Sequence, residues 1–134
     1  MTARLIFRQE NCNPFTMETC PFCQIISHSL PADIVYEDEQ TIAIQDLHPI
    51  SPVHILIIPK THIASLNEMT ELQDALLGQL LLTARKIARE QGIGEGYRLV
   101  INTGLKGGQT VFHLHIHLIG GAPLGADLLT RGLR

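Results

Sequence analysis

Histidine is the residue type in this chain that most strongly suggests chemistry. The sequence of 134 residues contains seven histidines, and three of them, His113, His115 and His117, fall within five positions. They alternate with leucine and isoleucine, so on a β-strand the imidazoles would share one face and the apolar side chains the other. Three clustered titrating groups contribute little to solubility, and we therefore interpret them as a functional site.

Two kinds of chemistry fit this spacing. Alternate strand residues lie ~6.6 Å apart and the outer pair ~13 Å apart, so all three imidazoles cannot bind one metal ion unless the strand bends. His113 and His115 alone could serve a zinc hydrolase, although no obvious carboxylate lies nearby in the sequence. In the other interpretation one imidazole is a nucleophile or base, and the others support it electrostatically.

The residues just before the histidines favour the second interpretation. Gly107 and Gly108 lack a Cβ atom, so their backbone N–H groups can approach a ligand closely. Thr110 adds a hydroxyl group two residues later. Together with the imidazoles, these donors predict a site for a phosphate anion.

The cysteines give a second signal. The chain has three, an odd number that does not make a disulfide framework, and Cys20 and Cys23 form a C-x-x-C motif. In a reducing compartment this spacing indicates half of a zinc site or a redox pair. Two cysteines that only pack in the core remain an alternative.

The elements that must position these residues can be predicted from pattern. A capping box at Thr70 and Gln73 opens a long amphipathic helix over residues 71–91, and Gly92 ends it. A short helical turn is expected over 20–27, and strands over 33–37, 41–46, 54–58, 97–102 and 111–119. This order predicts an α+β fold with a five-stranded antiparallel sheet, one long helix and a short N-terminal helix.

Composition narrows the class of protein. With 45% hydrophobic and 17% charged residues, the chain is that of a globular domain. Its net charge of −3 argues against nucleic acid as a partner. No apolar run approaches the ~18 residues of a membrane span, and no secretory signal is evident. We expect a single-domain cytoplasmic protein with no membrane partner.

The run from His113 to Ile119 resembles the signature of the histidine-triad (HIT) family of nucleotide hydrolases and transferases. Segments similar to its Hint-like branch follow in family order from about Cys20 to Gly121: residues 31–38, 46–49, 54–60 and 96–100, with Asn102 and residues 107–109. The resemblance implies a HIT-like domain over 17–121. Residues 1–16 would be a flexible extension, and the tail 122–134 would lie near the active site.

The resemblance also implies an activity, the hydrolysis of purine nucleoside phosphoramidates such as AMP joined to an amine. His115 would attack the α-phosphorus to form a nucleotidyl-histidine intermediate, from which water releases the mononucleotide. His117 would donate to the phosphate oxygens beside Gly108, and His54 would orient the triad.

The same resemblance assigns the substrate contacts. Asp46 would accept hydrogen bonds from both ribose hydroxyls. Asn102 and Thr110 would contact the phosphate and leaving group, with Gly107 and Gly108 around the phosphate. The family often has serine at the position of Thr110, and the added methyl group bears on leaving-group preference. The base would lie in an apolar slot formed by Ile25, Leu30, Ile44 and Leu47.

Resemblance to members with a C-x-x-C motif implies a structural zinc ion held by Cys20, Cys23, His62 and His113. These four ligands would leave no open position for catalysis. Family members usually form homodimers through a continuous sheet. Two rival functions remain: a dinucleoside polyphosphate hydrolase on the same fold, and a nucleotide-binding sensor or scaffold without enzymatic activity.

Overall fold

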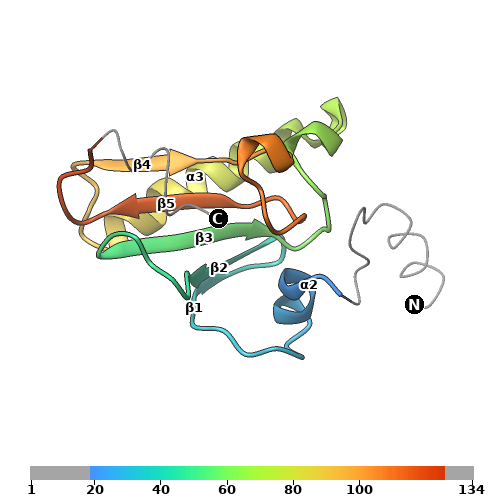
Figure 1. Ribbon diagram of the computed structural model, residues 1–134, viewed down its shortest axis with the longest axis horizontal. Coiled ribbons are helices and arrows are strands. Elements are labelled where there is room, and N and C mark those ends of the chain that lie inside the picture. The colour runs from blue at the N-terminus through green and yellow to red at the C-terminus, as the bar shows by residue number, and fades with distance from the viewer. Residues whose placement is uncertain (1–18, 126–134) are drawn as a thin grey trace.

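A five-stranded antiparallel sheet forms the centre of the protein (Figure 1). The computed structural model describes residues 19–125, so the expected extension 1–16 and residues 126–134 of the expected tail lie outside the described residues. The strand order is β1-β2-β3-β5-β4. The strands are β1 Ile34–Glu37, β2 Thr41–Gln45, β3 Val53–Pro59, β4 Tyr97–Val100 and β5 Ile116–Gly120. The predicted α+β class is confirmed.

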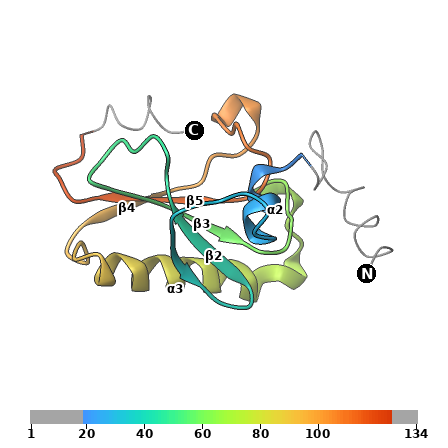
Figure 2. The ribbon, with the colours of Figure 1, turned by 90° about the horizontal axis from the view of Figure 1, so that it is seen from below.

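The long helix α3, Asp74–Glu90, covers one face of this sheet (Figure 2). Its entry is the 3-10 turn η2, Glu71–Gln73, where the side-chain oxygen of Gln73 accepts the Thr70 N–H at 2.9 Å, as the capping box predicts. Its exit uses Gly92 at φ +78°, and the Ile93 N–H then reaches the Ala88 carbonyl at 2.9 Å. Both ends of the predicted helix are therefore set by local sequence.

The strand β3 supplies apolar side chains to both faces of the sheet. Ile55 and Ile57 pack with Leu80 of α3 in one core cluster. Leu56 and Ile58 belong to a second cluster that includes the short helix α2, Pro21–Ile26. The central strand predicted over 54–58 is thus covered on both sides, and α2 lies on the face opposite α3.

The strand predicted over 111–119 is wrong at its beginning. β5 starts at Ile116, and residues 111–115 leave the strand ladder. There the Leu114 N–H donates to the Ile63 carbonyl at 2.7 Å, in a loop outside the sheet. Leu114, Ile116 and Leu118 still share the core on the α3 side. The alternation of faces is therefore confirmed, while the straight strand assumed for the three histidines is not.

Candidate functional site

The three clustered histidines are all buried, yet each has a different neighbourhood. His113, His115 and His117 are 0%, 3% and 0% exposed. His113 lies against the two cysteines, His115 lines a pocket, and His117 pairs with His54 from the adjacent strand β3. Because the chain bends before β5 begins at Ile116, the three imidazoles lie in three different surroundings.

Hydrogen bonds fix the proton positions of the His54–His117 pair. The Ile50 backbone N–H donates to His54 Nδ1 at 3.2 Å, so the proton of neutral His54 is on Nε2. That N–H donates to His117 Nδ1 at 2.9 Å, which leaves the proton of His117 on Nε2. His117 is thereby oriented as a donor through its outer nitrogen, the role that the family resemblance implies.

Burial lowers the pKa of His54, although the nearby carboxylate of Asp46 acts to raise it. Asp46 Oδ2 lies 3.4 Å from His54 Nε2, and Asp46 Oδ1 accepts the His48 N–H at 2.7 Å. A lowered pKa keeps His54 neutral at pH 7, as its role as an acceptor from Ile50 requires.

His115 has the tautomer that a nucleophile needs. Its Nδ1 lies 2.7 Å from the carbonyl oxygen of His113, which can only accept, so Nδ1 carries the proton. The lone pair therefore resides on Nε2. The ring centroids of His115 and His117 are 5.0 Å apart, so the two imidazoles are in contact.

A pocket of about 360 Å³ opens beside His115. Asp46 and Thr110 line it together with all four residues of the expected base slot: Ile25, Leu30, Ile44 and Leu47. Ile25 and Ile44 are buried, whereas Leu47 is 87% exposed at the rim. The structure thus brings the predicted ribose, base and nucleophile residues into one cavity, in the usual manner of small-molecule sites.

The glycine loop before the triad is held by Gln109. Its side-chain oxygen accepts the Gly104 N–H at 2.9 Å, and its amide donates to the Ala64 and Val111 carbonyls at 2.7 and 3.0 Å. This loop includes the 3-10 turn η3, Leu105–Gly107, and Gly108 at φ +93°. A Cβ atom on Gly108 would lie 3.9 Å from Asn102 Cγ, so the two predicted phosphate residues are neighbours.

The four predicted metal ligands converge. One donor atom from each of Cys20, Cys23, His62 and His113 lies within 4.8 Å of the others. Cys20 Sγ is 3.4 Å from His113 Nδ1, and Cys23 Sγ is 3.1 Å from His62 Nδ1 and 3.6 Å from His113 Nδ1. A tetrahedral ion with bonds of ~2.3 Å to sulfur and ~2.05 Å to nitrogen separates these atoms by about 3.6 Å. The cluster therefore fits a metal ion such as zinc.

The chemistry of the donors agrees with this geometry. His113 Nε2 donates to the Pro59 carbonyl at 2.8 Å, which leaves Nδ1 with the lone pair directed at the thiols. Hydrogen bonding from Cys23, and then from His113 and His62, lowers the pKa of Cys20 far below its ordinary range, although burial acts to raise it. No disulfide joins Cys20 to Cys23.

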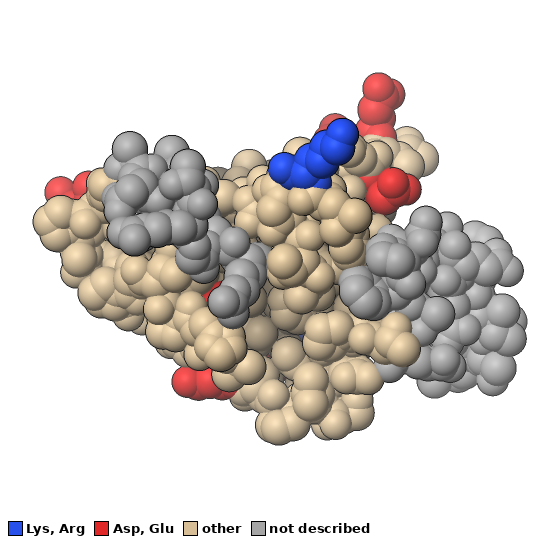
Figure 3. Space-filling view, viewed as in Figure 1, with Lys and Arg blue, Asp and Glu red and all other residues tan. Residues whose placement is uncertain are grey.

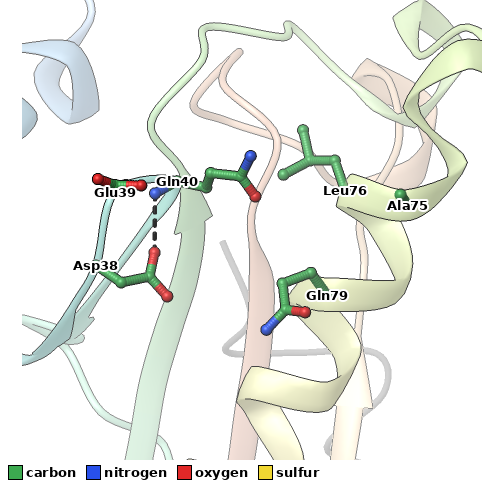
Figure 4. Close-up of a pocket in the computed structure, with 6 residues that line it drawn as sticks. All are labelled: Asp38, Glu39, Gln40, Ala75, Leu76 and Gln79. Atoms are coloured by element: carbon green, nitrogen blue, oxygen red, sulfur yellow. Dashed lines mark hydrogen bonds between the residues drawn. The ribbon is translucent and has the colours of Figure 1, made fainter.

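A second hollow, of about 570 Å³, lies between the β1–β2 turn and the start of α3 (Figure 4). One of its polar residues is engaged in the turn itself: Asp38 Oδ1 accepts the N–H groups of Gln40 and Thr41, both at 2.8 Å. The lining consists of Asp38, Glu39, Gln40, Ala75, Leu76 and Gln79, with no histidine. We assign this hollow to the turn and not to catalysis.

The face of the sheet opposite α3 is turned toward the viewer in Figure 3. Its described surface is mostly uncharged, with few acidic or basic side chains. None of the described helices has both the length and the apolar character needed to cross a bilayer.

Two buried residues near the predicted site were assigned no role in the sequence analysis. Phe22 lies between the two cysteines of the C-x-x-C motif and contacts the rings of His113 and His115. Gln109 follows the glycine pair and is 2% exposed. Both residues lie in or next to motifs that the sequence analysis identified, and this position was the one indication of their importance. Neither phenylalanine nor glutamine is a typical catalytic or metal-binding residue.

The strand order, the buried His54–His117 pair and the glycine loop together describe a cluster of histidines on an α+β sheet. The chain belongs to the HIT family, since the family model for the HIT domain matches residues 27–124. It is 59% identical over 103 residues to a HIT-like protein of Synechococcus elongatus, covering 77% of this chain and 90% of the relative. It is 46% identical over 113 residues to a purine nucleoside phosphoramidase of Escherichia coli, covering 84% of this chain and 95% of that one.

Solved structures agree with this assignment. A HIT family hydrolase from Legionella pneumophila superposes with a TM-score of 0.79 at 43% identity, over 81% of this chain and 97% of that chain. A HIT family hydrolase from Clostridium thermocellum gives a TM-score of 0.79 at 52% identity, over 82% and 96% of the two chains.

Proposed function

We propose that this protein is a hydrolase of purine nucleoside phosphoramidates that works through a nucleotidyl-histidine intermediate on His115. The observation that carries the proposal is the 2.7 Å bond from His115 Nδ1 to the His113 carbonyl, because it leaves the lone pair on Nε2 of a residue that lines the pocket. The E. coli relative named for this activity adds support at 46% identity.

In the proposed reaction, His115 Nε2 attacks the α-phosphorus, the bond from phosphorus to nitrogen breaks, and the leaving nitrogen takes a proton from water, so that a neutral amine departs. The Thr110 hydroxyl donates a hydrogen bond to the leaving nitrogen. His117 Nε2–H stabilises the charge on the phosphate oxygens, together with the N–H groups near Gly108. Water then attacks the phosphorus, the bond to His115 breaks, one proton of that water returns to solvent, and the mononucleotide is released. Neutral imidazole suits both steps because it is nucleophilic at pH 7 and leaves readily once phosphorylated.

The test is a panel of adenosine and guanosine phosphoramidates with different amines, run beside a diadenosine polyphosphate. We expect turnover of the phosphoramidates and a loss of at least ~10³-fold in kcat for His115→Ala, with mononucleotide binding retained. A matched control is His28→Asn: His28 is exposed, and at φ +64° asparagine is tolerated. This variant should keep full activity.

Other results point to the rival functions. Faster cleavage of the polyphosphate than of every phosphoramidate would assign the protein to the dinucleoside polyphosphate hydrolases. Binding of nucleotide without turnover of any substrate would indicate a sensor or scaffold. Near wild-type turnover by His115→Ala would eliminate the proposed mechanism.

We also propose that the metal of the Cys20, Cys23, His62 and His113 cluster is zinc and that its role is structural. Two thiolates and two imidazoles form a closed tetrahedral set with no position for substrate. Native mass spectrometry of protein purified without chelator should find one zinc per chain. A metal-free sample, with Cys20→Ser/Cys23→Ser as stable as the parent, would rule out the site.

We further propose a homodimer that extends the sheet at β4. Among the described strands, β4 pairs only with β5 and so forms an edge. On α3, Gln79 lines the hollow beside the β1–β2 turn and therefore marks the side of the helix nearest β1 and β2. Leu81 lies about 160° around the helix from Gln79, and so on the side of α3 nearest β4. Leu81 is 40% exposed there.

The dimer has a direct test by light scattering after gel filtration. Leu81→Asp should yield monomers. The matched control is Leu82→Asp, because Leu82 is 50% exposed but points away from the sheet. Dissociation of both variants, or of neither, would contradict this interface.

A further inference from the structure

Phe22 stands between the metal cluster and the nucleophile. It lies in α2 between Cys20 and Cys23 and is 7% exposed. Its ring meets that of His115 edge to face, with centroids 5.1 Å apart and planes at 84°. The same ring contacts His113, with centroids 5.9 Å apart and planes at 72°. One apolar side chain thus touches both a metal ligand and the attacking residue.

The backbone of His113 makes a second connection. Its imidazole Nδ1 faces Cys20 Sγ at 3.4 Å, while its carbonyl oxygen accepts the Nδ1–H of His115 at 2.7 Å. That hydrogen bond selects the tautomer of His115. A displacement of the His113 backbone would therefore move both the imidazole that faces the cysteines and the carbonyl that keeps the His115 lone pair on Nε2.

The helix that carries Phe22 depends on the cluster for its position. α2 has only six residues, and a helix so short is not stable on its own. Its N-cap is the Cys20 thiol, which accepts the Cys23 N–H at 3.4 Å. The two cysteines are 1% and 9% exposed and lie in the same core cluster as Phe22. Bonds from both thiolates to one ion would hold this first turn against the sheet.

We propose that Phe22 is a positioning residue for His115, held in place by the metal-bound cluster, so that metal occupancy sets the alignment of the nucleophile as well as the stability of the fold. The proposal rests on the proposed function for the catalytic role of His115. This proposal differs from a purely structural role of the metal in one respect. It requires that metal binding to the cluster changes the tautomer distribution of the His115 ring.

The test uses protein labelled with ¹⁵N-histidine, because ring nitrogen shifts report the tautomer directly. Zinc is titrated into the metal-free chain, and the His115 signals are assigned with His115→Gln. We expect these signals to move from averaged positions to a single Nδ1–H tautomer, complete at one zinc per chain. His115 signals that do not change on zinc binding, or a chain that binds no zinc, would overturn the proposal. This arm needs no variant of Phe22.

A second arm isolates Phe22. In Phe22→Leu, the cluster should still bind one Co²⁺ with the absorption bands of a tetrahedral thiolate site, but the His115 signals should remain averaged. Single-turnover cleavage should fall ~10-fold or more, since a small misplacement of a reacting group is costly. Phe22→Tyr keeps the aromatic ring and should show the single His115 tautomer and the single-turnover rate of the parent. The matched control is Ile42→Val, because Ile42 is fully buried in the same cluster and does not line the pocket.

The outcomes separate the two proposals. If Phe22→Leu matches the parent in both the His115 signals and the rate, Phe22 only fills the core and the inference fails. If the parent cleaves no phosphoramidate and the His115 ring still responds to zinc through Phe22, the proposed function fails and the coupling stands.

Discussion

At the scale of single residues, the site is defined by which nitrogen of each imidazole holds a proton. Backbone groups make that selection twice: the Ile50 N–H acts on His54, and the His113 carbonyl acts on His115. Backbone partners cannot titrate, so the tautomers persist over the whole pH range in which the rings are neutral. The same residues in a looser loop would lose this selection.

The lowered pKa of His54 has a consequence for stability. Its ordinary value is 6.5, and burial lowers it in the folded state. Between the lowered value and 6.5, the unfolded chain binds more protons than the folded chain, so the free energy of unfolding falls as the pH drops through that window. His54→Gln does not titrate there and should show a weaker dependence. Thermal melts between pH 7.5 and 5, at constant zinc, measure the difference. Parallel curves for the two proteins would contradict this prediction.

Asp46 gives a prediction that separates ribose recognition from folding. Asp46→Asn keeps an oxygen for the His48 N–H but removes the charge offered to the ribose hydroxyls. A charged hydrogen bond contributes about 1.5–3 kcal/mol, so KM should rise by ~10-fold or more. The control is a 2′,3′-dideoxyribose substrate, for which parent and variant should have equal KM. An equal loss with both substrates would show that Asp46 acts only on the local fold.

At the scale of elements, the glycine loop is held by one side chain. The side chain of Gln109 makes hydrogen bonds to three backbone groups: the N–H of Gly104 and the carbonyls of Ala64 and Val111. Such bonds contribute about 1 kcal/mol each on balance. Gln109→Ala should therefore lower the free energy of unfolding by about 2–3 kcal/mol and also reduce kcat. Urea unfolding and phosphoramidate turnover check both effects. Gln79→Ala, on the exposed side of α3, is the control and should change neither.

Elements defined by neighbouring residues could be predicted from the sequence, whereas those defined by distant contacts could not. The ends of α3 depend on Thr70, Gln73 and Gly92, which lie within or next to the helix. The start of β5 depends on the bond from Leu114 to Ile63, which pattern cannot reveal. The alternation of residues 113–118 correctly predicted which side chains face α3 and which face away from it. An extended chain alternates its side chains in this way whether or not it is hydrogen-bonded into the sheet. The contacts of Phe22 with the triad and of Gln109 with the glycine loop could be found only from the three-dimensional fold.

At the scale of the whole molecule, the metal cluster joins segments that are far apart in the chain. Cys20 and His113 are separated by 93 positions and lie 3.4 Å apart. Because a cross-link between distant segments restricts the unfolded chain, removal of the metal should lower Tm by several degrees. Differential scanning calorimetry with a chelator, followed by added zinc, measures the loss and its recovery. Cys20→Ser/Cys23→Ser should not respond to either addition.

The order of the strands has a consequence for the making of the protein. Among the described strands, β4 joins the rest of the sheet only through β5, which comes last in sequence and pairs with β3 and β4 on its two sides. While β5 is still inside the exit tunnel of the ribosome, β4 therefore has no partner in this sheet, and only β1, β2 and β3 can pair. His117 arrives with the same segment that closes the sheet. The described sheet and the proposed site around His117 are therefore completed in the same late step of folding.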